Sequence, residues 1–226
     1  MHPLLPDKFK EVIAKEGITV FRPAQEKALK AGLLEGKSLL VCTPTASGKT
    51  LIAEMAALKH ILEGKGKAIY IVPLIALANE KFKEFKRKYS HLCKIALSIG
   101  DLDSSDPYLV DYDLILCTAE KLDSLIRHHS PWLSLVSLVV IDEIHLINDV
   151  ERGPTLEILI TVLKQVLKNV QLIGLSATIG NPDELAEWLG ASLVQDDWRP
   201  VPLKKGTLYG GEVEFTEDFA MNSKSS

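Results

Sequence analysis

A loop that could bind phosphate stands near the start of the chain. The stretch CTPTASGKT, residues 42–50, nearly matches the pattern G-x-x-x-x-G-K-S/T, but Thr43 stands where the first glycine is usual. In such a loop, backbone N–H groups and a helix N-terminus point at the phosphates, and glycine is needed where a Cβ would collide with them, as at Gly48. Lys49 would reach the outer phosphates and the Thr50 hydroxyl would ligate Mg²⁺. Because Thr43 lies at the exit from a strand, its side chain can turn outward, and we interpret it as a variant of the loop.

Two adjacent acids follow an apolar run further along the chain. The stretch LVVIDEIH, residues 138–145, reads as a buried strand that ends in Asp142 and Glu143. A carboxylate at a strand tip beside a phosphate loop can hold Mg²⁺, as Asp142 would, and a second can align and deprotonate an attacking water, as Glu143 would. Surface solvation is the competing explanation, and the phosphate loop upstream makes it the minor one. His145 by itself is more typical of a packed or surface histidine.

Two short stretches complete this set of polar residues. FRPAQ, residues 21–25, precedes the loop, and the amide of Gln25 offers one donor and one acceptor, the complement of an adenine edge. SAT, residues 176–178, follows a strand, so that the hydroxyls of Ser176 and Thr178 can hydrogen-bond the acids of DEIH. Each stretch alone is also typical of a helix cap or a turn. Their order and their placement at strand ends favour one nucleotide site.

The elements that must position these residues alternate along the chain. Short β-branched runs and longer amphipathic stretches predict a parallel sheet with crossover helices. Strands are expected at 38–43, 68–72, 94–99, 113–117, 138–142 and 170–176. Helices are expected at 6–17, 23–36, 50–62, 74–88 and 155–168. The last carries an apolar stripe that should pack on the sheet, formed by Leu156, Leu159, Ile160, Leu163, Val166 and Leu167.

The domain organisation follows from length and from a change of pattern near the C-terminus. A chain of 226 residues fits one α/β unit with appendages. After Gly190 the sequence looks irregular, and we place the end of the compact domain near Trp198. We therefore expect N-terminal helices over 1–36, the main domain over 37–198, and a connection to an absent second domain with a disordered tail over 199–226.

Composition excludes several classes of protein. The formal net charge of −4 argues against coating nucleic acid by bulk electrostatics. The one clearly basic patch, KFKEFKRK at residues 81–88, is either a solvated helix face or a local contact. Cys42, Cys93 and Cys117 form no metal-binding or disulfide pattern, which favours reduced thiols. We find neither a membrane-spanning run nor a signal peptide, and we expect a cytoplasmic protein with no membrane partner.

The motifs, taken in order, resemble a known family. FRPAQ, TPTASGKT, PLIALANEK, TAEKLDSLIR, DEIH and SAT are similar to the motifs of the first RecA-like domain of superfamily 2 helicases. GDLDSSD (100–106), NPDELAEWLGA (181–191) and WRPVPL (198–203) narrow the resemblance to the archaeal Hjm type, relatives of the HelQ and Ski-type enzymes. The likeness runs from about Leu4 to Val213, and it implies a RecA-like P-loop domain, with a mostly parallel sheet and helices on both faces.

The resemblance implies ATP-driven 3′-to-5′ movement along single-stranded or forked DNA in repair, by a monomer. It implies that the nucleotide is bound by Phe21, Gln25, Thr45, Ala46, Ser47, Gly48, Lys49 and Thr50. Mg²⁺ is assigned to Thr50 and Asp142, and catalysis to Glu143 as base together with Lys49. Coupling of the ATP site to strand movement is assigned to His145, Ser176 and Thr178. Nucleic-acid contacts are assigned to the openings of two helices, at Pro73, Leu74, Thr118 and Glu120.

The chain departs from the family pattern in two further ways. Ile75 stands where an arginine is common, which removes one expected phosphate contact. The chain also lacks the motifs of a second RecA-like fold, an arginine finger, a strand-separating hairpin and a ratchet helix. An arginine finger contributes about a thousandfold or more to phosphoryl transfer. We therefore expect this chain alone to bind ATP·Mg²⁺ weakly, to hydrolyse it barely and to unwind nothing.

Three alternatives stay open at the level of sequence. An RNA helicase or another superfamily 2 translocase would carry the same ATP site, since DNA and RNA are told apart by 2′-OH contacts that these motifs do not reveal. A non-catalytic nucleotide-binding module would use the loop as a switch. A small-molecule kinase would share the loop, but nothing in the sequence resembles an acceptor pocket or a lid.

Overall fold

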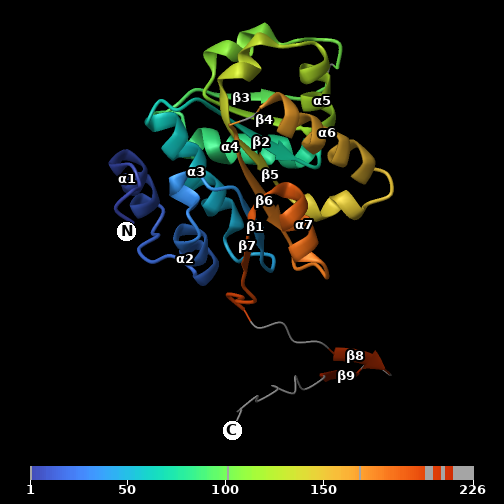
Figure 1. The fold of residues 1–226 in the computed structure, drawn as a ribbon. Helices are drawn as coiled ribbons and strands as arrows, with labels where there is room; N and C mark the ends of the chain where they lie inside the picture. Colours follow the sequence, from blue (N-terminus) through green and yellow to red (C-terminus); the bar gives the residue numbers. More distant parts are fainter. Residues whose placement is uncertain (1, 101, 168, 202–205, 210–211, 216–226) are drawn as a thin grey trace.

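The computed structural model describes every residue except 1, 101, 168, 202–205, 210–211 and 216–226. Its centre is a seven-stranded sheet in the order β3-β4-β2-β5-β6-β1-β7 (Figure 1). All the pairings in this sheet are parallel, which confirms the predicted parallel α/β fold. The strands are β1 (Leu39–Cys42), β2 (Lys67–Val72), β3 (Ile95–Ser98), β4 (Leu114–Thr118), β5 (Val136–Ile141), β6 (Gln171–Ser176) and β7 (Ser192–Gln195).

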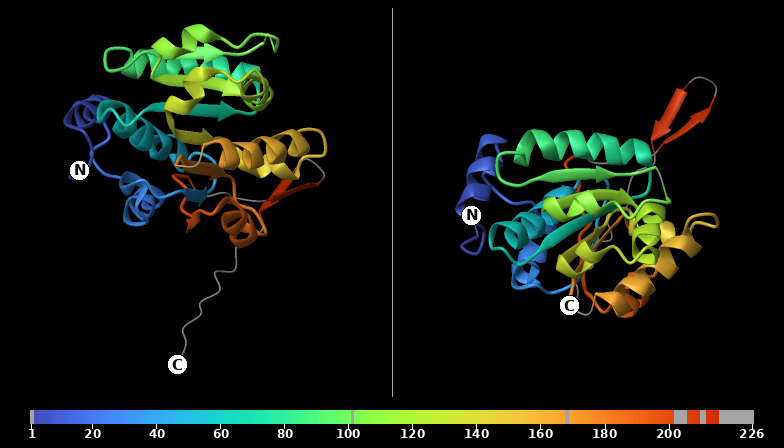
Figure 2. Two further views of the ribbon diagram at one scale, coloured as in Figure 1. Left: turned by 45° about the horizontal axis from the view of Figure 1, so that its top comes forward. Right: turned by 90° about the horizontal axis from the view of Figure 1, so that it is seen from above.

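Helices cover both faces of the sheet (Figure 2). One face is covered by α1 (Asp7–Lys15), α2 (Pro23–Lys30), α3 (Lys49–Leu62) and α4 (Ile75–Tyr89). The other is covered by α5 (Ala119–Arg127), α6 (Gly153–Val166) and α7 (Pro182–Leu189). Short 3-10 turns lie at Leu33–Glu35, Pro107–Asp111, Pro131–Leu135 and Ile144–Asn148. A hairpin of β8 (Gly206–Tyr209) and β9 (Glu212–Phe215) follows in the sequence.

Successive side chains of a strand point to opposite faces of the sheet, and each face has its own apolar core. In β1, Leu39 and Val41 belong to the cluster under α1–α4, whereas Leu40 and Cys42 belong to the cluster under α5–α7. Both sides are apolar because a parallel sheet is buried on both faces. The sequence thus carries continuous apolar runs where an exposed sheet would alternate.

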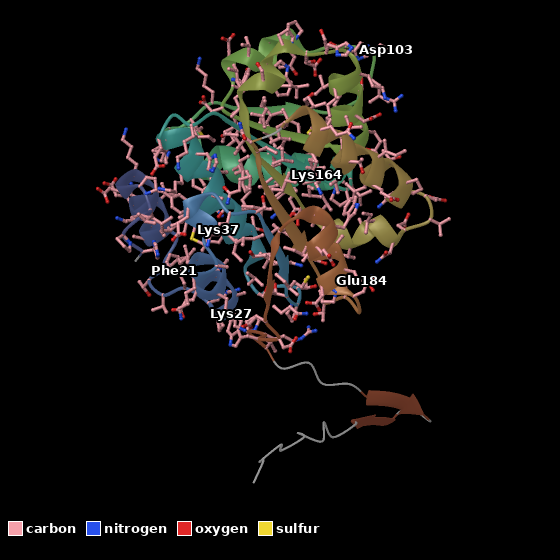
Figure 3. The ribbon with its side chains drawn as sticks, in the orientation of Figure 1. Phe21, Lys27, Lys37, Asp103, Lys164 and Glu184 are labelled. Atoms are coloured by element: carbon pink, nitrogen blue, oxygen red, sulfur yellow. The ribbon has the colours of Figure 1, made fainter. Side chains whose placement is uncertain are left out.

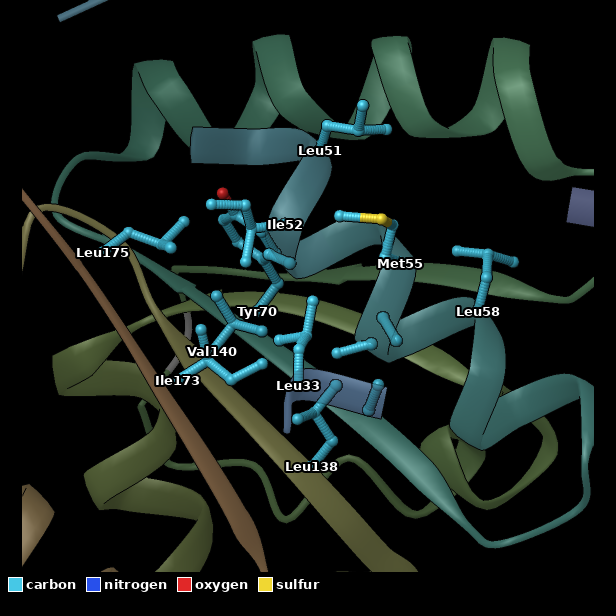
Figure 4. Close-up of a cluster of buried hydrophobic side chains, with 14 of the residues drawn as sticks. Leu33, Leu51, Ile52, Met55, Leu58, Tyr70, Leu138, Val140, Ile173 and Leu175 are labelled. Atoms are coloured by element: carbon cyan, nitrogen blue, oxygen red, sulfur yellow. The ribbon is translucent and has the colours of Figure 1, made fainter. Parts of the chain in front are cut away.

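Helix α3 is the buried helix that fixes the position of the phosphate loop. Its residues from Leu51 to His60 are all buried. Ile52, Met55 and Leu58 pack over Tyr70, Val140 and Ile173 of the sheet (Figure 4). Each such side chain contributes about 1.5–3 kcal/mol on burial. The N-terminus of α3 is consequently held in place at the carboxyl ends of the sheet strands.

Several elements differ from the sequence prediction. We read the chain after Gly190 as irregular, but β7 pairs with β1 there. Helix α7 was not among the expected helices, whereas α5 begins where the resemblance placed a helix opening, at Thr118 and Glu120. The stripe of α6 packs on the sheet as expected except at Val166, which is 53% exposed because it lies at the edge of the stripe, next to the end of the helix. None of the described helices is long and apolar enough to cross a bilayer.

The N-terminal helices share one core with the rest of the sheet. Phe9, Ile13 and Ala28 belong to the same apolar cluster as the side chains of α3 and β1. The division of the chain at 36/37 and at 198/199 therefore stays a prediction. The expected disordered tail, the last residues MNSKSS, lies outside the described residues.

Candidate functional site

Three motif-bearing strands end side by side at one edge of the sheet. β6 lies between β1 and β5, with Cys42 opposite Ser176 and Ile141 opposite Gly174. The phosphate loop leaves β1, SAT leaves β6 and DEIH leaves β5. Ligands of open parallel sheets bind outside the carboxyl ends of the strands. The geometry therefore brings the three motifs to the place where such a site is expected.

The phosphate loop has the strained backbone that a cradle of amides requires. Ala46 has φ +64° and Gly48 has φ +92°, both in the left-handed region. Gly48 is the N-cap of α3, so Lys49 and Thr50 open the buried helix. A Cβ built on Gly48 would stand 2.5 Å from Nε2 of Gln25. Only glycine fits here, both for its dihedral angle and for this close approach.

Thr43 corrects one sequence expectation. Its side chain does not turn outward: it is 0% exposed, and its Oγ1 lies 2.6 Å from Oγ of Ser47 inside the loop. The backbone N–H of Thr43 also donates to the carbonyl oxygen of Ser176 at 3.2 Å. The hydroxyl pair ties the two ends of the loop together. Threonine thus takes a structural part at the position where the usual pattern has glycine.

The start of α2 is hydrogen-bonded to the phosphate loop. Gln25 is buried, its Oε1 accepts from the backbone N–H of Arg22 at 2.9 Å, and its Nε2 donates to the carbonyl oxygen of Gly48 at 3.0 Å. The guanidinium of Arg22 donates to the carbonyl oxygen of Ala46 at 2.6 Å, and it lies 5.4 Å from the centre of the Trp198 ring. Sequence reasoning missed Arg22, although it stands inside the FRPAQ motif.

A cavity of about 400 Å³ opens beside Gln25 and Gly48 and reaches Thr50 and Glu54 on α3. Phe21, which the resemblance places with the nucleotide, is half-buried and lines a different cavity (its position is labelled in Figure 3). That cavity is bordered by His2, Thr19, Val20, Glu26, Leu29 and Lys30. The structure therefore brings Gln25 to the loop, whereas Phe21 lines a separate cavity.

Lys49 joins the loop to the other two motifs. Its Nζ donates to the carbonyl oxygen of Ser176 at 2.9 Å and lies 3.8 Å from Oε2 of Glu143. The Lys49 side chain is only 10% exposed and that of Glu143 is 35% exposed. A largely desolvated cation thus faces an acid that is open to solvent on one side. The arrangement suits a site that attracts a polyanion and retains a free carboxylate.

Asp142 is oriented by two donors. The hydroxyl of Tyr70 on β2 donates to Oδ2 at 2.9 Å, and the backbone N–H of Glu143 donates to Oδ1 at 3.0 Å. Burial, and next the charge of Asp142, raise the pKa of Tyr70 well above its usual value, so it stays a neutral donor. Each carboxylate oxygen keeps a free lone pair for a cation or a water. Tyr70 was missed, although the polar tip of a buried tyrosine needs a partner.

His145 connects DEIH to SAT through the backbone. Its Nδ1 accepts the N–H of Ala177 at 3.4 Å and lies 3.3 Å from Oε2 of Glu143. Nδ1 can accept from Ala177 in one tautomer and donate to Glu143 in the other, but it cannot do both at once. The expected hydrogen bonds from SAT hydroxyls to the acids are not formed: Oγ of Ser176 is buried without a partner among the described residues, and Thr178 is exposed.

The hydroxyl of Thr50 is bonded by a lysine of α4. Lys81 donates from Nζ to Oγ1 of Thr50 at 2.8 Å. Further along the same helix, Lys88 lies 3.1 Å from the buried carboxylate of Glu54 on α3. The basic patch at 81–88 is thus only in part a solvated face. Lys81 and Lys88, seven residues apart, share the face of α4 that turns to the phosphate-loop helix.

The residues assigned to nucleic acid lie at the openings of α4 and α5. β2 and β4 are neighbours, so Pro73 and Leu74 stand beside Thr118 at the same edge of the sheet. Oγ1 of Thr118 caps α5 by accepting the N–H of Lys121 at 3.4 Å, and Glu120 is exposed in its first turn. The first amides of both helices therefore lie at the same end of the sheet strands.

A small cavity of about 20 Å³ separates these helix openings from the acids. Its lining includes Pro73, Glu120, Asp142, Glu143 and Arg152. This volume is about that of one water molecule. Residues of the two predicted groups therefore line one and the same small cavity.

Comparison with known proteins agrees with this geometry. A sequence model described as DEAD/DEAH box helicase matches residues 22–185. The chain belongs to the DEAD/DEAH box helicase family. The match spans the phosphate loop, both acids and SAT. This confirms the resemblance to superfamily 2 helicases that the motifs predicted.

Individual relatives narrow the comparison. The chain is 57% identical over 212 residues to the ATP-dependent DNA helicase Hel308 of Pyrococcus abyssi, covering 94% of this chain and 29% of that protein. It is 59% identical over 216 residues to the Hel308 of Methanocaldococcus jannaschii, covering 92% of this chain and 18% of that protein. The chain thus spans less than a third of the length of these helicases.

Solved structures of helicases share the fold. The crystal structure of the DUF1998 helicase MrfA aligns with a TM-score of 0.75 and 27% identity, over 87% of this chain and 33% of that one. The structure of MrfA bound to DNA and AMPPNP aligns with a TM-score of 0.76 and 28% identity, over 87% of this chain and 30% of that one. The helicase domain described here therefore has the RecA-like fold that was predicted.

The donor set fits a magnesium ion held together with phosphates. Among the described residues, no cluster of three or more His, Cys, Asp or Glu side chains could hold a metal by itself. Thr50 and Asp142 offer one hydroxyl and one carboxylate. Mg²⁺ is usually bound by one or two protein oxygens, substrate phosphates and water. The ammonium of Lys81 on the Thr50 hydroxyl already shows that a cation is accepted there.

Proposed function

We propose that this domain is the nucleotide-binding motor domain of an ATP-dependent DNA helicase that moves 3′-to-5′ on single-stranded or forked DNA during repair. The observation that carries the proposal is the position of the Lys49 ammonium, between the carbonyl oxygen of Ser176 and the carboxylate of Glu143 at the N-terminus of a buried helix. The Hel308 relatives, named as ATP-dependent DNA helicases, and the MrfA structure with DNA and AMPPNP support it.

The proposed roles follow from the contacts. The amides of residues 45–50 and the Lys49 ammonium bind the phosphates, because they combine a helix N-terminus with a desolvated cation. In the Gln25 amide, one N–H and one oxygen lone pair are hydrogen-bonded within the protein. The second N–H and the second lone pair can bind an adenine edge. Thr50 and Asp142 would hold Mg²⁺, which, when bound, neutralises charge on the phosphates.

Glu143 is proposed as the general base. Its carboxylate is partly open to solvent, so a water can reach it, and the Lys49 ammonium lies 3.8 Å away. The backbone of Glu143 has φ +51°, a strained value that is typical of functional positions. Nδ1 of His145 lies 3.3 Å from Oε2 of Glu143 and 3.4 Å from the backbone nitrogen of Ala177, so a change of tautomer would exchange one partner for the other and so link the DEIH and SAT segments.

The helix openings at Pro73, Leu74, Thr118 and Glu120 are proposed to bind the nucleic-acid backbone through their amides. Ile75, 52% exposed in the first turn of α4, supplies no charge there. A second RecA-like fold, which the longer relatives have room for, would supply the arginine finger. Preference for DNA over RNA, the monomeric state and the cytoplasmic location stay predictions.

The test is nucleotide binding by this chain, measured with a fluorescent ADP in the presence of Mg²⁺. Lys49→Ala is expected to weaken binding about 10- to 150-fold, since charge-assisted hydrogen bonds are worth about 1.5–3 kcal/mol. Lys30→Ala, which removes an exposed lysine of α2, is the matched control and should change nothing. Equal affinities of the two variants would contradict the proposed site.

Hydrolysis separates the motor from a non-catalytic module. Glu143→Gln keeps the shape of the side chain and removes the base. We expect the variant to bind ATP as well as the unaltered chain and to lose the slow hydrolysis of this domain in a sensitive phosphate-release assay. Unchanged hydrolysis in Glu143→Gln would favour the switch module instead.

A further inference from the structure

A lysine of α4 donates a hydrogen bond to the Thr50 hydroxyl, the group that is proposed above to bind the metal. Nζ of Lys81 donates to Oγ1 of Thr50 at 2.8 Å, and the Lys81 side chain is only 21% exposed. The contact joins two helices whose residues lie 31 positions apart in the sequence. It is not one of the solvated contacts that a basic run of residues usually makes.

A metal ion and this ammonium cannot both hold the Thr50 hydroxyl without repulsion. A magnesium ion lies about 2.1 Å from an oxygen ligand. With the ammonium 2.8 Å from the same oxygen, the two cations would be at most about 5 Å apart. Like charges at that distance repel strongly in a partly buried site. A metal that coordinates Thr50 would therefore take the place of Lys81 on this oxygen, and we expect Lys81 to move when a metal–nucleotide complex binds.

The surroundings of Lys81 provide a place for it to go. Oε2 of Glu84, one turn further along α4, lies 3.9 Å from its Nζ. The other oxygen of Glu84 is held by Lys88 at 2.7 Å, and Lys88 also contacts the buried Glu54 of α3 at 3.1 Å. A small rotation of the Lys81 side chain would thus exchange the hydroxyl of Thr50 for a carboxylate that is already in position.

The two lysine contacts fasten α4 to α3 in different ways. Lys88 contacts the buried carboxylate of Glu54 on α3. Neither residue is among those proposed to bind the phosphates or the metal. The contact of Lys81 with Thr50 involves an atom that the metal would take. The N-terminal half of α4, which begins beside Leu74 at the proposed nucleic-acid contact, packs on the core through Leu77 and Ala78 and is joined to the phosphate-loop helix by the releasable contact.

We propose that Lys81 is a positioning residue that stands in for the metal on Thr50 in the nucleotide-free domain and is displaced by the metal–nucleotide complex. Its displacement loosens the first turns of α4 from the phosphate-loop helix. The inference rests on the proposed function, because it requires the nucleotide site described above. It adds a physical link between that site and the helix opening at Leu74.

The first test is the Mg²⁺ dependence of fluorescent ADP binding by this chain. In Lys81→Met, binding no longer breaks a hydrogen bond, so the affinity in Mg²⁺ should rise about 2- to 10-fold. Binding in EDTA should not change. Lys83→Met is the matched control on an exposed position of the same helix, and Lys81→Arg, which retains a cation, should behave like the unaltered chain.

The second test is hydrogen–deuterium exchange of residues 75–81 with and without Mg·ADP. Exchange should increase on nucleotide binding in the unaltered chain and in Lys83→Met, and should be high in Lys81→Met in both states. The increase is the readout that a purely structural lysine would not produce.

The outcomes separate this inference from the proposed function. If Lys49→Ala loses binding while Lys81→Met behaves like Lys83→Met, only the inference is overturned. Weaker binding by Lys81→Met in both Mg²⁺ and EDTA would make Lys81 a direct phosphate ligand and would also overturn it. If the unaltered chain binds no nucleotide, or Lys49→Ala binds equally well, the proposed function falls and the inference with it.

Discussion

Replacement of Gly48 by alanine should destabilise the domain by more than backbone strain alone. Gly48 has φ +92° and Gly36 has the similar value of +87°. An alanine in the left-handed region costs about 1–2 kcal/mol at either position. A Cβ on Gly36 meets nothing within 4 Å, whereas a Cβ on Gly48 would stand 2.5 Å from Nε2 of Gln25. Gly36→Ala is therefore a control with matched dihedral strain and no collision.

The collision at Gly48 can be assigned a magnitude. The amide of Gln25 is buried and donates to the carbonyl oxygen of Gly48 at 3.0 Å, so it cannot move away without losing that bond. The net loss is about 0.5–1.5 kcal/mol for one hydrogen bond. Gly48→Ala should thus lose about 1.5–3.5 kcal/mol in total, against about 1–2 kcal/mol for Gly36→Ala.

Urea unfolding followed by circular dichroism measures both losses. In a thermal scan, each kcal/mol corresponds to about 2–4 °C for a domain of this size. A third variant, Gly48→Ala combined with Gln25→Ala, removes the obstructing amide and should show that the two losses are not additive. Equal losses for Gly48→Ala and Gly36→Ala would refute the close approach on which the reasoning depends.

Three further substitutions test individual contacts. Thr43→Gly, which restores the usual loop pattern, should lower stability by about 1–3 kcal/mol in urea unfolding, because the buried bond to Ser47 is lost and chain entropy rises. Tyr70→Phe should weaken Mg²⁺-dependent nucleotide binding in fluorescence titration, with EDTA binding unchanged, because Asp142 loses one of its two donors. Burial raises the pKa of Glu54 against the opposing charge of Lys88. The folded state therefore binds the proton of Glu54 more tightly than the unfolded state does. The free energy of unfolding should fall as the pH rises from about 4.5 through the raised pKa of Glu54, and this pH dependence should be absent in Glu54→Gln.

Periodicity predicted most of the fold because the core is made of continuous apolar runs. The six expected strands all form, and α3 begins within one residue of its expected start. Strand β7 was not predicted because it is a four-residue edge strand with two exposed positions, which is too short to show a strand's alternation of apolar and polar residues. Its place in the sheet comes from pairing with β1, a contact that no local signal records.

The site shows where sequence reasoning stops. The motifs predicted that the loop and the acids converge, since parallel strands end at one edge. The partners of Lys81 and Tyr70 lie 31 and 72 residues away along the chain, so spacing within a motif does not reveal them. The error at Thr43 had a usable signal. Thr43 follows Val41 by two residues and must point to the same face as that buried side chain.

The basic run of α4, for which the sequence left two readings open, carried a usable signal as well. Ala78 and Phe85 are buried, and Lys81 and Lys88 each lie three residues after one of them. Helical periodicity therefore places both lysines beside the buried face, which argues against a fully solvated patch. The remaining cations of the run, Lys83, Lys86 and Arg87, are exposed as expected.

The central claim is that one cleft holds the phosphates at the N-terminus of α3 and the metal between Thr50 and Asp142. The most direct measurement is a crystal structure of this chain with AMPPNP and Mn²⁺ in place of Mg²⁺, in which anomalous scattering locates the metal. We expect the metal beside Oγ1 of Thr50 and the carboxylate of Asp142, the phosphates on the amides of residues 45–50, and Glu143 facing the terminal phosphate. A nucleotide bound elsewhere, or a metal remote from Asp142, would contradict the account.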